Sequence, residues 1–373
     1  MLLSEYSTNA SNTNHVHANG RTLHVTRYGL FGQVGGLLSL VKKQSREVAF
    51  EAERQAIAEE VGDILWYLCA VLREFGLSFD AIAKPLITDR AVGGISFGDL
   101  DPNGSARGDL PPDEDLNTLA ITVSDVMRAA QKSRPADELT AFLRALINVA
   151  AKYDVSLERA AELNLEKVHD RWPIGEKHYP APQDLRHPKY ERFPDQICFD
   201  FIERKLSGGE PHVYMQVNGV NLGDRLTDNM HRDDGYRFHD VFHIAYAVHL
   251  GWSPVLRGLL KLKRKSDPSI DENEDGARAQ IIEEGIATWI FNHAANAEPK
   301  FYSDIFPGKL PFHLLKQVTA MVRGYEVEAA AKWQWECAIL DGFKVFRELN
   351  TRGGGRVMAN FHRHELSYLP PEN

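Results

Sequence analysis

The sequence is poor in cysteine and has no long hydrophobic run. Its 373 residues include only Cys69, Cys198 and Cys337, which lie too far apart for a CxxC metal knuckle or a disulfide framework. A membrane-spanning helix needs about 18 or more consecutive apolar residues, and no such run occurs. The first twenty residues also lack the apolar core of a secretion signal. We therefore expect a cytoplasmic protein with no membrane partner.

The chain also lacks a surplus of positive charge. It contains 43 basic and 52 acidic residues, which gives a net charge of -9. A general nucleic-acid binder needs excess Lys and Arg to contact phosphates, so this composition disfavours nucleic acid as a partner. At roughly 150 residues per domain, the length indicates two domains or one unusually large one.

Helical periodicity runs through the first half of the chain, and a proline-rich stretch separates it from the second. Strands are expected beyond this stretch at 197–202 and 212–217, and long helices at 237–250, 277–296 and 327–346. Proline removes a backbone donor and fixes φ, which disfavours helices and central strands in the stretch itself. The predicted fold class is mainly α, with four parts: a flexible N-terminal arm at 1–27, a helical bundle at 28–172, a Pro-rich linker at 173–195 and a mostly helical α+β domain at 196–373.

Two polar stripes stand out in the predicted bundle. Glu60 and Asp63 lie three residues apart on one helical face, where a hard cation such as Mg²⁺ would relieve their repulsion. Asn164, Lys167 and Arg171 form the second stripe, whose amide and two cations suit a polyphosphate. Each stripe alone is also explained by a solvated helical face. Their combination in one bundle suits hydrolysis of a nucleoside triphosphate.

Three segments resemble the motifs of the MazG-like all-α nucleoside triphosphate pyrophosphohydrolases. They are GLFGQVGGLLSLVKK, EEVGDILWYL and NLEKVHDRW, in this order between Tyr28 and Trp172. The resemblance implies a helical bundle that forms a homodimer or homotetramer. It also implies cleavage of NTP or dNTP to monophosphate plus pyrophosphate with Mg²⁺, or Mn²⁺ in its place.

The resemblance also assigns roles to residues. It implies Glu60 and Asp63 as catalytic residues and metal ligands, and Asn164, Lys167 and Arg171 as nucleotide contacts. Beside the resemblance, Glu59 is a further catalytic candidate, Gln33 a further metal ligand and Lys42 a further nucleotide contact. The family's first acidic pair, E-x-x-E, is replaced here by the segment from Gln33 to Gly36. An amide offers only a neutral oxygen, so weaker metal binding and slow or absent turnover are expected. A nucleotide sensor without catalysis stays open as the alternative.

Histidines and acids cluster in the second half. His239 and His243, with Asp240 between them, have the i, i+4 spacing at which two imidazoles reach one transition metal. Glu283 and Glu284 are candidates for a further ligand from another helix. Three interpretations stay open: an HExxH-like peptidase site, an HD-type phosphohydrolase site that also uses His231, and a buried hydrogen-bonded network between helices, which is the favoured one. The surrounding sequence is similar to the extension of a subset of MazG-like proteins, which implies no activity.

Overall fold

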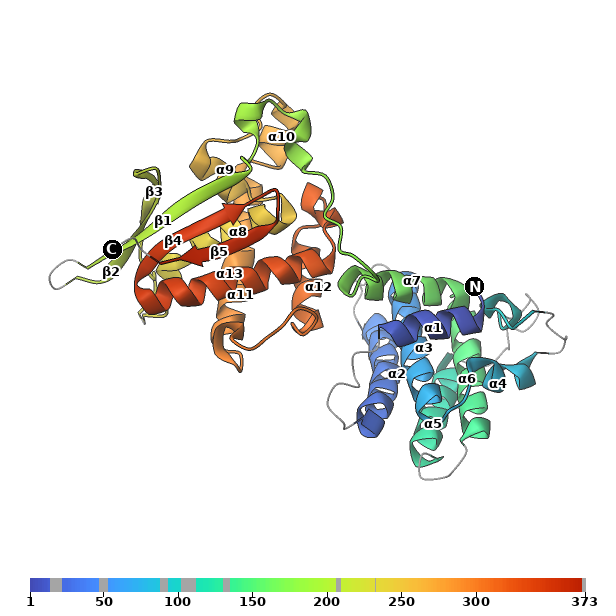
Figure 1. Cartoon of the computed structure of the whole chain (residues 1–373). Helices are drawn as coiled ribbons and strands as arrows, with labels where there is room; N and C mark the ends of the chain where they lie inside the picture. The colour runs from blue at the N-terminus through green and yellow to red at the C-terminus, as the bar shows by residue number, and fades with distance from the viewer. Residues whose placement is uncertain are drawn as a thin grey trace. The chain divides into compact units, whose positions relative to one another are not determined.

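The computed structural model describes residues 1–13, 22–46, 53–87, 93–101, 112–129, 135–205, 209–231 and 233–370. They form two units, Met1–Gly175 and Glu176–Asn373, each with its own hydrophobic core (Figure 1). The fold is mainly α, as the sequence predicts, with one antiparallel sheet in the C-terminal unit. None of the helices in these ranges combines the length and apolar character needed to cross a membrane.

The N-terminal unit is a helical bundle. Its helices, with η marking 3-10 helices, are α1 (Leu3–Asn12), α2 (Thr22–Arg46), α3 (Glu53–Glu74), α4 (Phe79–Ala83), η2 (Lys84–Leu86), η3 (Phe97–Asp99), α5 (Pro112–Ala129), α6 (Ala136–Lys152) and α7 (Leu157–Arg171). The central helix is α3, which packs against α1, α2, α6 and α7. Its apolar stripe, from Ile57 through Val61 and Ile64 to Leu68, is fully buried. A helical stripe of this spacing is what the sequence predicts for a bundle core.

The prediction of a flexible arm at 1–27 is wrong for the described part of that range. Residues 3–12 form α1, and Leu3, Tyr6 and Ala10 are buried in the core of the bundle. These three residues follow the i, i+3, i+7 spacing of one helical face. The Ser, Asn and Thr residues between them hide this short stripe in the composition. Residues 14–21 lie outside the described part of the chain.

Helices α3 and α7 approach each other closely at Gly62. A Cβ atom at this position would overlap the carbonyl oxygen of Ala160 and lie 2.9 Å from the Cβ of Asn164. Glycine therefore allows the backbones of the two helices to touch. The next residue, Asp63, is thereby held against the polar face of α7.

We predict that Gly62→Ala destabilises the bundle. The added methyl group has no room beside Ala160, and overpacking of this kind costs about 1–3 kcal/mol. The free energy of unfolding would be measured by chemical denaturation of the full chain, with hydrogen exchange of α3 and α7 peptides to assign the transition. Gly32→Ala is the matched control, because a Cβ there has no described atom within 4 Å. Equal stability of the two variants would contradict the prediction.

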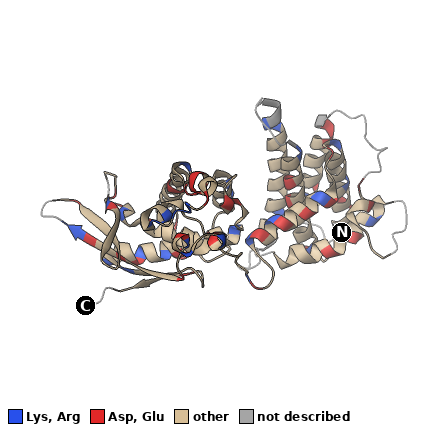
Figure 2. Cartoon of the chain, turned by 90° about the horizontal axis from the view of Figure 1, so that it is seen from above, with Lys and Arg blue, Asp and Glu red and all other residues tan. Residues whose placement is uncertain are grey.

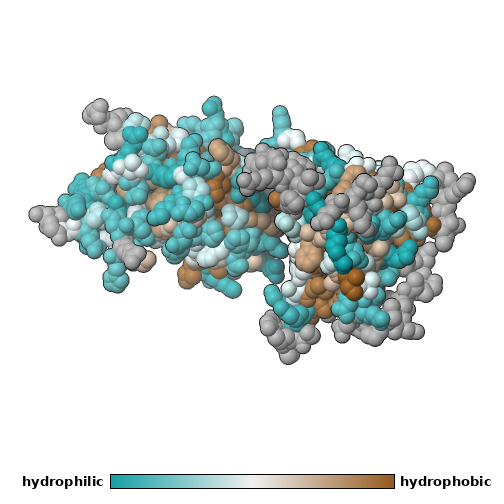
Figure 3. All heavy atoms as spheres, turned by 90° about the horizontal axis from the view of Figure 1, so that it is seen from below, coloured by the Kyte–Doolittle hydropathy of each residue, from teal (hydrophilic) through white to brown (hydrophobic). Residues whose placement is uncertain are grey.

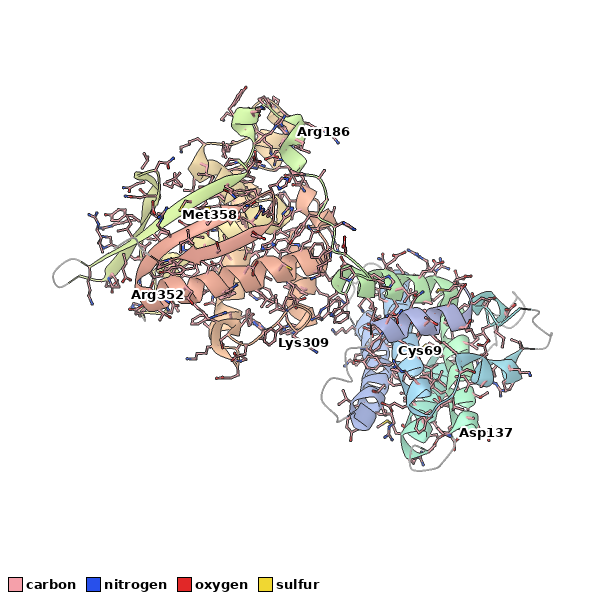
Figure 4. The ribbon with its side chains drawn as sticks, viewed as in Figure 1. Cys69, Asp137, Arg186, Lys309, Arg352 and Met358 are labelled. Carbon is pink, nitrogen blue, oxygen red and sulfur yellow. The ribbon has the colours of Figure 1, made fainter. Side chains whose placement is uncertain are left out.

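The C-terminal unit combines helices with a five-stranded antiparallel sheet. Its helices are η4 (Gln183–Arg186), η5 (Lys189–Glu191), η6 (Tyr236–Phe238), α8 (Asp240–Leu250), α9 (Pro254–Leu260), α10 (Pro268–Asn273), α11 (Ala277–Ala295), η7 (Lys300–Tyr302), α12 (Phe312–Met321), η8 (Glu326–Ala329) and α13 (Lys332–Arg352). Its strands are β1 (Gln196–Lys205), β2 (Pro211–Val217), β3 (Val220–Leu226), β4 (Gly354–Asn360) and β5 (Glu365–Leu369), in the order β3-β2-β1-β4-β5. Helices α8 and α13 pack against β4 and β5. In Figure 4, Met358 marks β4 and Arg352 the end of α13.

The two strands expected from the sequence are confirmed as parts of β1 and β2, whereas β4 and β5 were not predicted. Alternate residues of β1, Phe199 and Phe201, point into the core, which is the period-2 pattern of a half-buried strand. Strand β4 begins at Gly354, the middle residue of the triple glycine 353–355, which directly follows the end of α13. Glycine at this strand start concealed it.

The sequence predicts a linker at 173–195, but most of this proline-rich segment packs as part of a folded unit. From Glu176 onward it belongs to the C-terminal unit. Buried Asp184 accepts a hydrogen bond from Arg257 Nη2 at 2.8 Å, and buried Glu191 accepts one from the backbone N–H of Ser266 at 2.9 Å. Proline prevents long helices here, but it does not prevent packing through side-chain hydrogen bonds.

Candidate functional sites

Asp63 joins the two polar stripes of the bundle. Its Oδ1 accepts a hydrogen bond from Asn164 Nδ2 at 2.9 Å, and its Oδ2 accepts one from Lys167 Nζ at 2.5 Å. The residues of the first pair are 101 positions apart in the sequence. The acidic stripe of α3 and the amide-and-cation stripe of α7 therefore face each other in one site.

Tyr6 of α1 orients the amide of Asn164. Its hydroxyl donates to Asn164 Oδ1 at 3.1 Å, so the amide nitrogen of Asn164 is turned toward Asp63. Burial raises the pKa of Tyr6 well above its usual value, which keeps the hydroxyl protonated and able to donate. Tyr6 is not among the residues predicted from the sequence, because the whole first segment is expected to be a flexible arm. The apolar spacing of residues 3, 6 and 10 was the available signal.

Glu60 lies against α2 at the position of the missing acidic pair. A Cβ atom on Gly36 would lie 2.8 Å from Glu60 Oε2, so the carboxylate rests directly on the glycine. Gln33 is one helical turn before Gly36 and shares its face of α2. The segment that replaces the family's E-x-x-E thus faces the carboxylate predicted to bind metal.

The other predicted residues of this site lie around it. Glu59 is half-buried on α3, about 100° around the helix from Glu60. Lys42 is exposed on α2, about 9 Å farther along the helix axis than Gly36. Arg171 is buried at the end of α7, and its guanidinium lies 4.5 Å from the ring centroid of Trp172. Arg171 is therefore held by a cation–π contact.

The oxygen donors of this site are of the kind that Mg²⁺ binds. Mg²⁺ is usually bound by one or two protein carboxylates together with substrate phosphates and water. Glu60 and Asp63 offer two carboxylates and Gln33 a neutral amide oxygen, while Lys167 balances one negative charge. Two-metal sites require more acidic ligands than this set provides.

Cys69 is not a candidate nucleophile in the bundle. It lies on α3 in the core, where Figure 4 labels it, and burial raises its pKa to about 12. The thiolate is the reactive form of cysteine, so this thiol is inert near neutral pH.

The histidine cluster of the C-terminal unit lies where α8 begins. One ligand atom each from His239, Asp240 and His243 all fall within 4.8 Å of one another. Glu284 of α11 approaches both imidazoles, with Oε2 at 3.8 Å from His239 Nε2 and Oε1 at 3.5 Å from His243 Nε2. The structure therefore brings together four of the residues that the sequence suggests for this site. His231, which the HD-type interpretation requires, is exposed on the segment after β3.

Both imidazoles are fixed through their Nδ1 atoms. His239 Nδ1 donates to the carbonyl oxygen of Tyr236 at 3.0 Å, and His243 Nδ1 donates to Glu283 Oε1 at 2.8 Å. Glu283 was a candidate ligand from the sequence, and the structure instead places it behind His243. Burial by itself lowers the pKa of His243, but the carboxylates of Glu283 and Glu284 outweigh it and raise this pKa well above its usual value.

Glu283 is itself fully satisfied. Its Oε1 also accepts a hydrogen bond from Ser253 Oγ at 2.6 Å, and its Oε2 accepts one from the backbone N–H of Val255 at 2.8 Å. A buried carboxylate is costly unless several donors pair with it, and here three donors do so. The carboxylate is thereby fixed as the support of His243.

Comparison with known protein families gives a match for the C-terminal unit. Residues 178–372 match the family model described as the MazG C-terminal domain. The chain belongs to this family. No curated protein and no solved structure matches the chain. The match agrees with the resemblance of the second half of the chain to the extension of MazG-like proteins. It does not test the resemblance of the three N-terminal motifs, because the helices of the N-terminal unit lie outside the matched residues.

The MazG C-terminal domain also contains a cavity of about 540 Å³, lined in part by Tyr179, His249 and His364. Tyr179 stacks on His364 with 3.6 Å between ring centroids, and its hydroxyl lies 2.8 Å from His249 Nδ1. His249 Nε2 in turn lies 2.9 Å from Asp341 Oδ2. This hydrogen-bonded chain is not predicted from the sequence, because Tyr179 belongs to the segment expected to be a linker.

We predict that Tyr6→Phe destabilises the bundle although the aromatic ring is kept. Asn164 Oδ1 would lose its donor inside the protein, and an unsatisfied buried polar atom costs about 1–3 kcal/mol. Chemical denaturation would measure this loss as a lower free energy of unfolding. Tyr190→Phe is the control, because Tyr190 is 73% exposed and its change should have no measurable effect. A Tyr6→Phe variant as stable as this control would show that the hydroxyl is not needed.

Proposed function

We propose that the N-terminal bundle is a Mg²⁺-dependent nucleoside triphosphate pyrophosphohydrolase. It would convert an NTP or dNTP and water into the monophosphate, pyrophosphate and a proton. The observation that carries this proposal is the meeting of Asp63 with both Asn164 and Lys167, which joins an acidic and a phosphate-binding stripe in one site. Membership of the chain in a MazG-related family supports it, because that family is related to nucleotide pyrophosphatases.

Glu60 and Asp63 are the residues that would hold the cation, with the amide oxygen of Gln33 as a neutral ligand. Mg²⁺, or Mn²⁺ in its place, would supply charge neutralisation for the phosphates and polarise the bond to be cleaved. Lys167 Nζ lies 2.5 Å from Asp63 and would contact a phosphate oxygen from there. Asn164 would donate from its amide, while Lys42 and Arg171 would bind the outer part of the nucleotide. A carboxylate oxygen of Glu59 or Glu60 would accept the proton of the attacking water.

The missing acidic pair makes slow turnover part of this proposal. Gln33 cannot neutralise the charge of the cation or accept a proton. A bundle that binds a nucleotide without cleaving it is the second possibility, and it would act as a sensor through a shift between two conformations. Both functions use the same phosphate-binding residues, so only turnover separates them.

The surface of the bundle supports a small-molecule ligand and a second copy of the chain as partners. Acidic and basic residues are interspersed over both units in Figure 2, which does not suit a general nucleic-acid surface.

Val25, Tyr28 and Phe31 form an exposed apolar stripe on α2. Hydrophobic residues also reach the surface of the N-terminal unit in Figure 3. We propose a homodimer or homotetramer in which a stripe of this kind is covered.

We predict that Glu60→Gln lowers kcat for pyrophosphate release by about 100-fold or more, which corresponds to about 2.7 kcal/mol. The change removes the carboxylate charge at almost constant shape. Release of pyrophosphate and monophosphate would be measured for a panel of ribo- and deoxynucleoside triphosphates with Mg²⁺ or Mn²⁺. Glu162→Gln is the control, because Glu162 is exposed on α7 and pairs with Arg159 at 3.2 Å. Equal rates for Glu60→Gln and the wild type would place the chemistry outside this site.

We predict that Gln33→Glu raises kcat by about tenfold or more, because it restores one acidic ligand. Of positions 33 and 36, where the family has its acidic pair, position 33 is the better choice, since a side chain at Gly36 would collide with Glu60. Gln55→Glu makes the same chemical change at an exposed position of α3 and serves as the control. Nucleotide binding without any gain in turnover would favour the sensor.

A further inference from the structure

We propose that His239, Asp240, His243 and Glu284 bind one transition-metal dication of the Zn²⁺, Mn²⁺ or Fe²⁺ class in the C-terminal unit. This site is separate from the nucleotide site proposed for the bundle and uses different ligand chemistry. Imidazole nitrogen suits the first-row transition metals, whereas Mg²⁺ prefers oxygen ligands alone. The site would hold its metal whether or not the bundle hydrolyses nucleotides.

The first observation is a buried nitrogen atom that lacks a hydrogen bond. His243 is 0% exposed, and its Nε2 has no hydrogen-bond partner among the described residues. The carboxylate oxygen of Glu284 at 3.5 Å is farther away than a normal hydrogen bond allows. Buried polar atoms are almost always satisfied, and an exception calls for a water molecule or an ion. The cluster around this nitrogen consists of metal-binding groups.

The second observation is that both imidazoles are set to present Nε2. Carbonyl and carboxylate oxygens accept hydrogen bonds, so the Nδ1 atoms that face them carry the protons in the neutral imidazoles. The Nε2 atoms of His239 and His243 therefore face the cluster, and a metal ion that binds there takes the place of any proton on Nε2. A carboxylate or carbonyl behind a ligating imidazole is the usual support of protein metal sites. Tyr236 also stacks on His239 at 4.3 Å with an interplanar angle of 1°, which fixes the ring plane.

The third observation concerns the spacing of the atoms. The separations of 3.5, 3.6 and 3.8 Å between the Nε2 atoms and the carboxylates are long for hydrogen bonds. Ligand atoms about 2.0–2.1 Å from a tetrahedral metal are about 3.3 Å apart, which is close to these values. A hydrogen-bonded network would have drawn these groups together, so the spacing favours an ion between them over the structural network.

The charges and the exposure of the cluster agree with a dication. Asp240 and Glu284 bring two negative charges to the cluster, and Glu283 behind His243 adds a third, so the cluster attracts a doubly charged ion. Glu284 is 44% exposed, whereas the two histidines are buried. The site therefore has one side open to solvent, through which a metal enters and a water molecule can complete its coordination.

Metal titration of the full chain tests this proposal. The protein would be stripped with a chelator and titrated with Co²⁺, whose visible absorption reports tetrahedral coordination, and then with Zn²⁺ in competition with a chromophoric chelator. Glu284→Gln removes one ligand at constant shape on a half-exposed side chain. Glu348→Gln is its matched control, because Glu348 is 46% exposed on α13 and pairs with Arg352. His239→Ala tests the nitrogen ligand independently.

We expect the wild type and Glu348→Gln to bind one metal ion in this site, and both Glu284→Gln and His239→Ala to bind it at least about tenfold more weakly. Thermal unfolding would verify that each variant is folded. Glu60→Gln should leave this Co²⁺ band unchanged, which separates the site from that of the bundle. Absence of the band in the wild type would overturn the proposal. So would Zn²⁺ affinities of Glu284→Gln and His239→Ala equal to that of Glu348→Gln.

Discussion

The candidate site of the bundle depends on the backbone contact between α3 and α7 at Gly62. Any side chain there would overlap Ala160, and the separation of the two helices would increase. The strength of a hydrogen bond falls steeply with distance. A small increase in the distance between the two helices would therefore break both hydrogen bonds of Asp63, to Asn164 and to Lys167. The absence of a side chain at Gly62 therefore allows the polar side chains of α3 and α7 to lie within hydrogen-bond distance of one another. This glycine belongs to the same short motif as the carboxylates, so the acid and the space it requires occur together in the sequence.

The sequence predicts those parts of the structure that rest on long periodic patterns. The stripe of α3 spans about three turns and identifies the bundle core, and both polar stripes lie on faces that the helical spacing gives. Which stripes face each other is a tertiary property, and only the family resemblance suggested it. The failures are short or interrupted elements. Helix α1 has three apolar residues among polar ones, and β4 begins with glycine. The proline-rich segment packs through Asp184 and Glu191, which no pattern of apolar residues reveals.

The two neighbouring carboxylates Glu283 and Glu284 show why residue type alone does not assign a role. Glu283 and Glu284 are neighbours on α11, yet one accepts three hydrogen bonds in the core and the other faces solvent. Adjacent helical residues point about 100° apart, so one of the pair supports His243 from behind while the other reaches the open side. The sequence offers both as ligands. Only the position of Ser253 and Val255, at the start of α9, decides between them.

The two candidate sites differ in what limits their affinity for a metal ion. In the site proposed for the bundle every donor is an oxygen, and of its two carboxylates Asp63 already pairs with Lys167. Cation affinity there depends on the phosphates that the nucleotide brings, so metal and nucleotide should bind together. In the C-terminal unit the supports of both imidazoles are already in place, so little ordering remains to oppose metal binding. Under both proposals, nucleotide would act on the site of the bundle, while the preorganised site of the C-terminal unit would keep its metal ion whether or not nucleotide is bound.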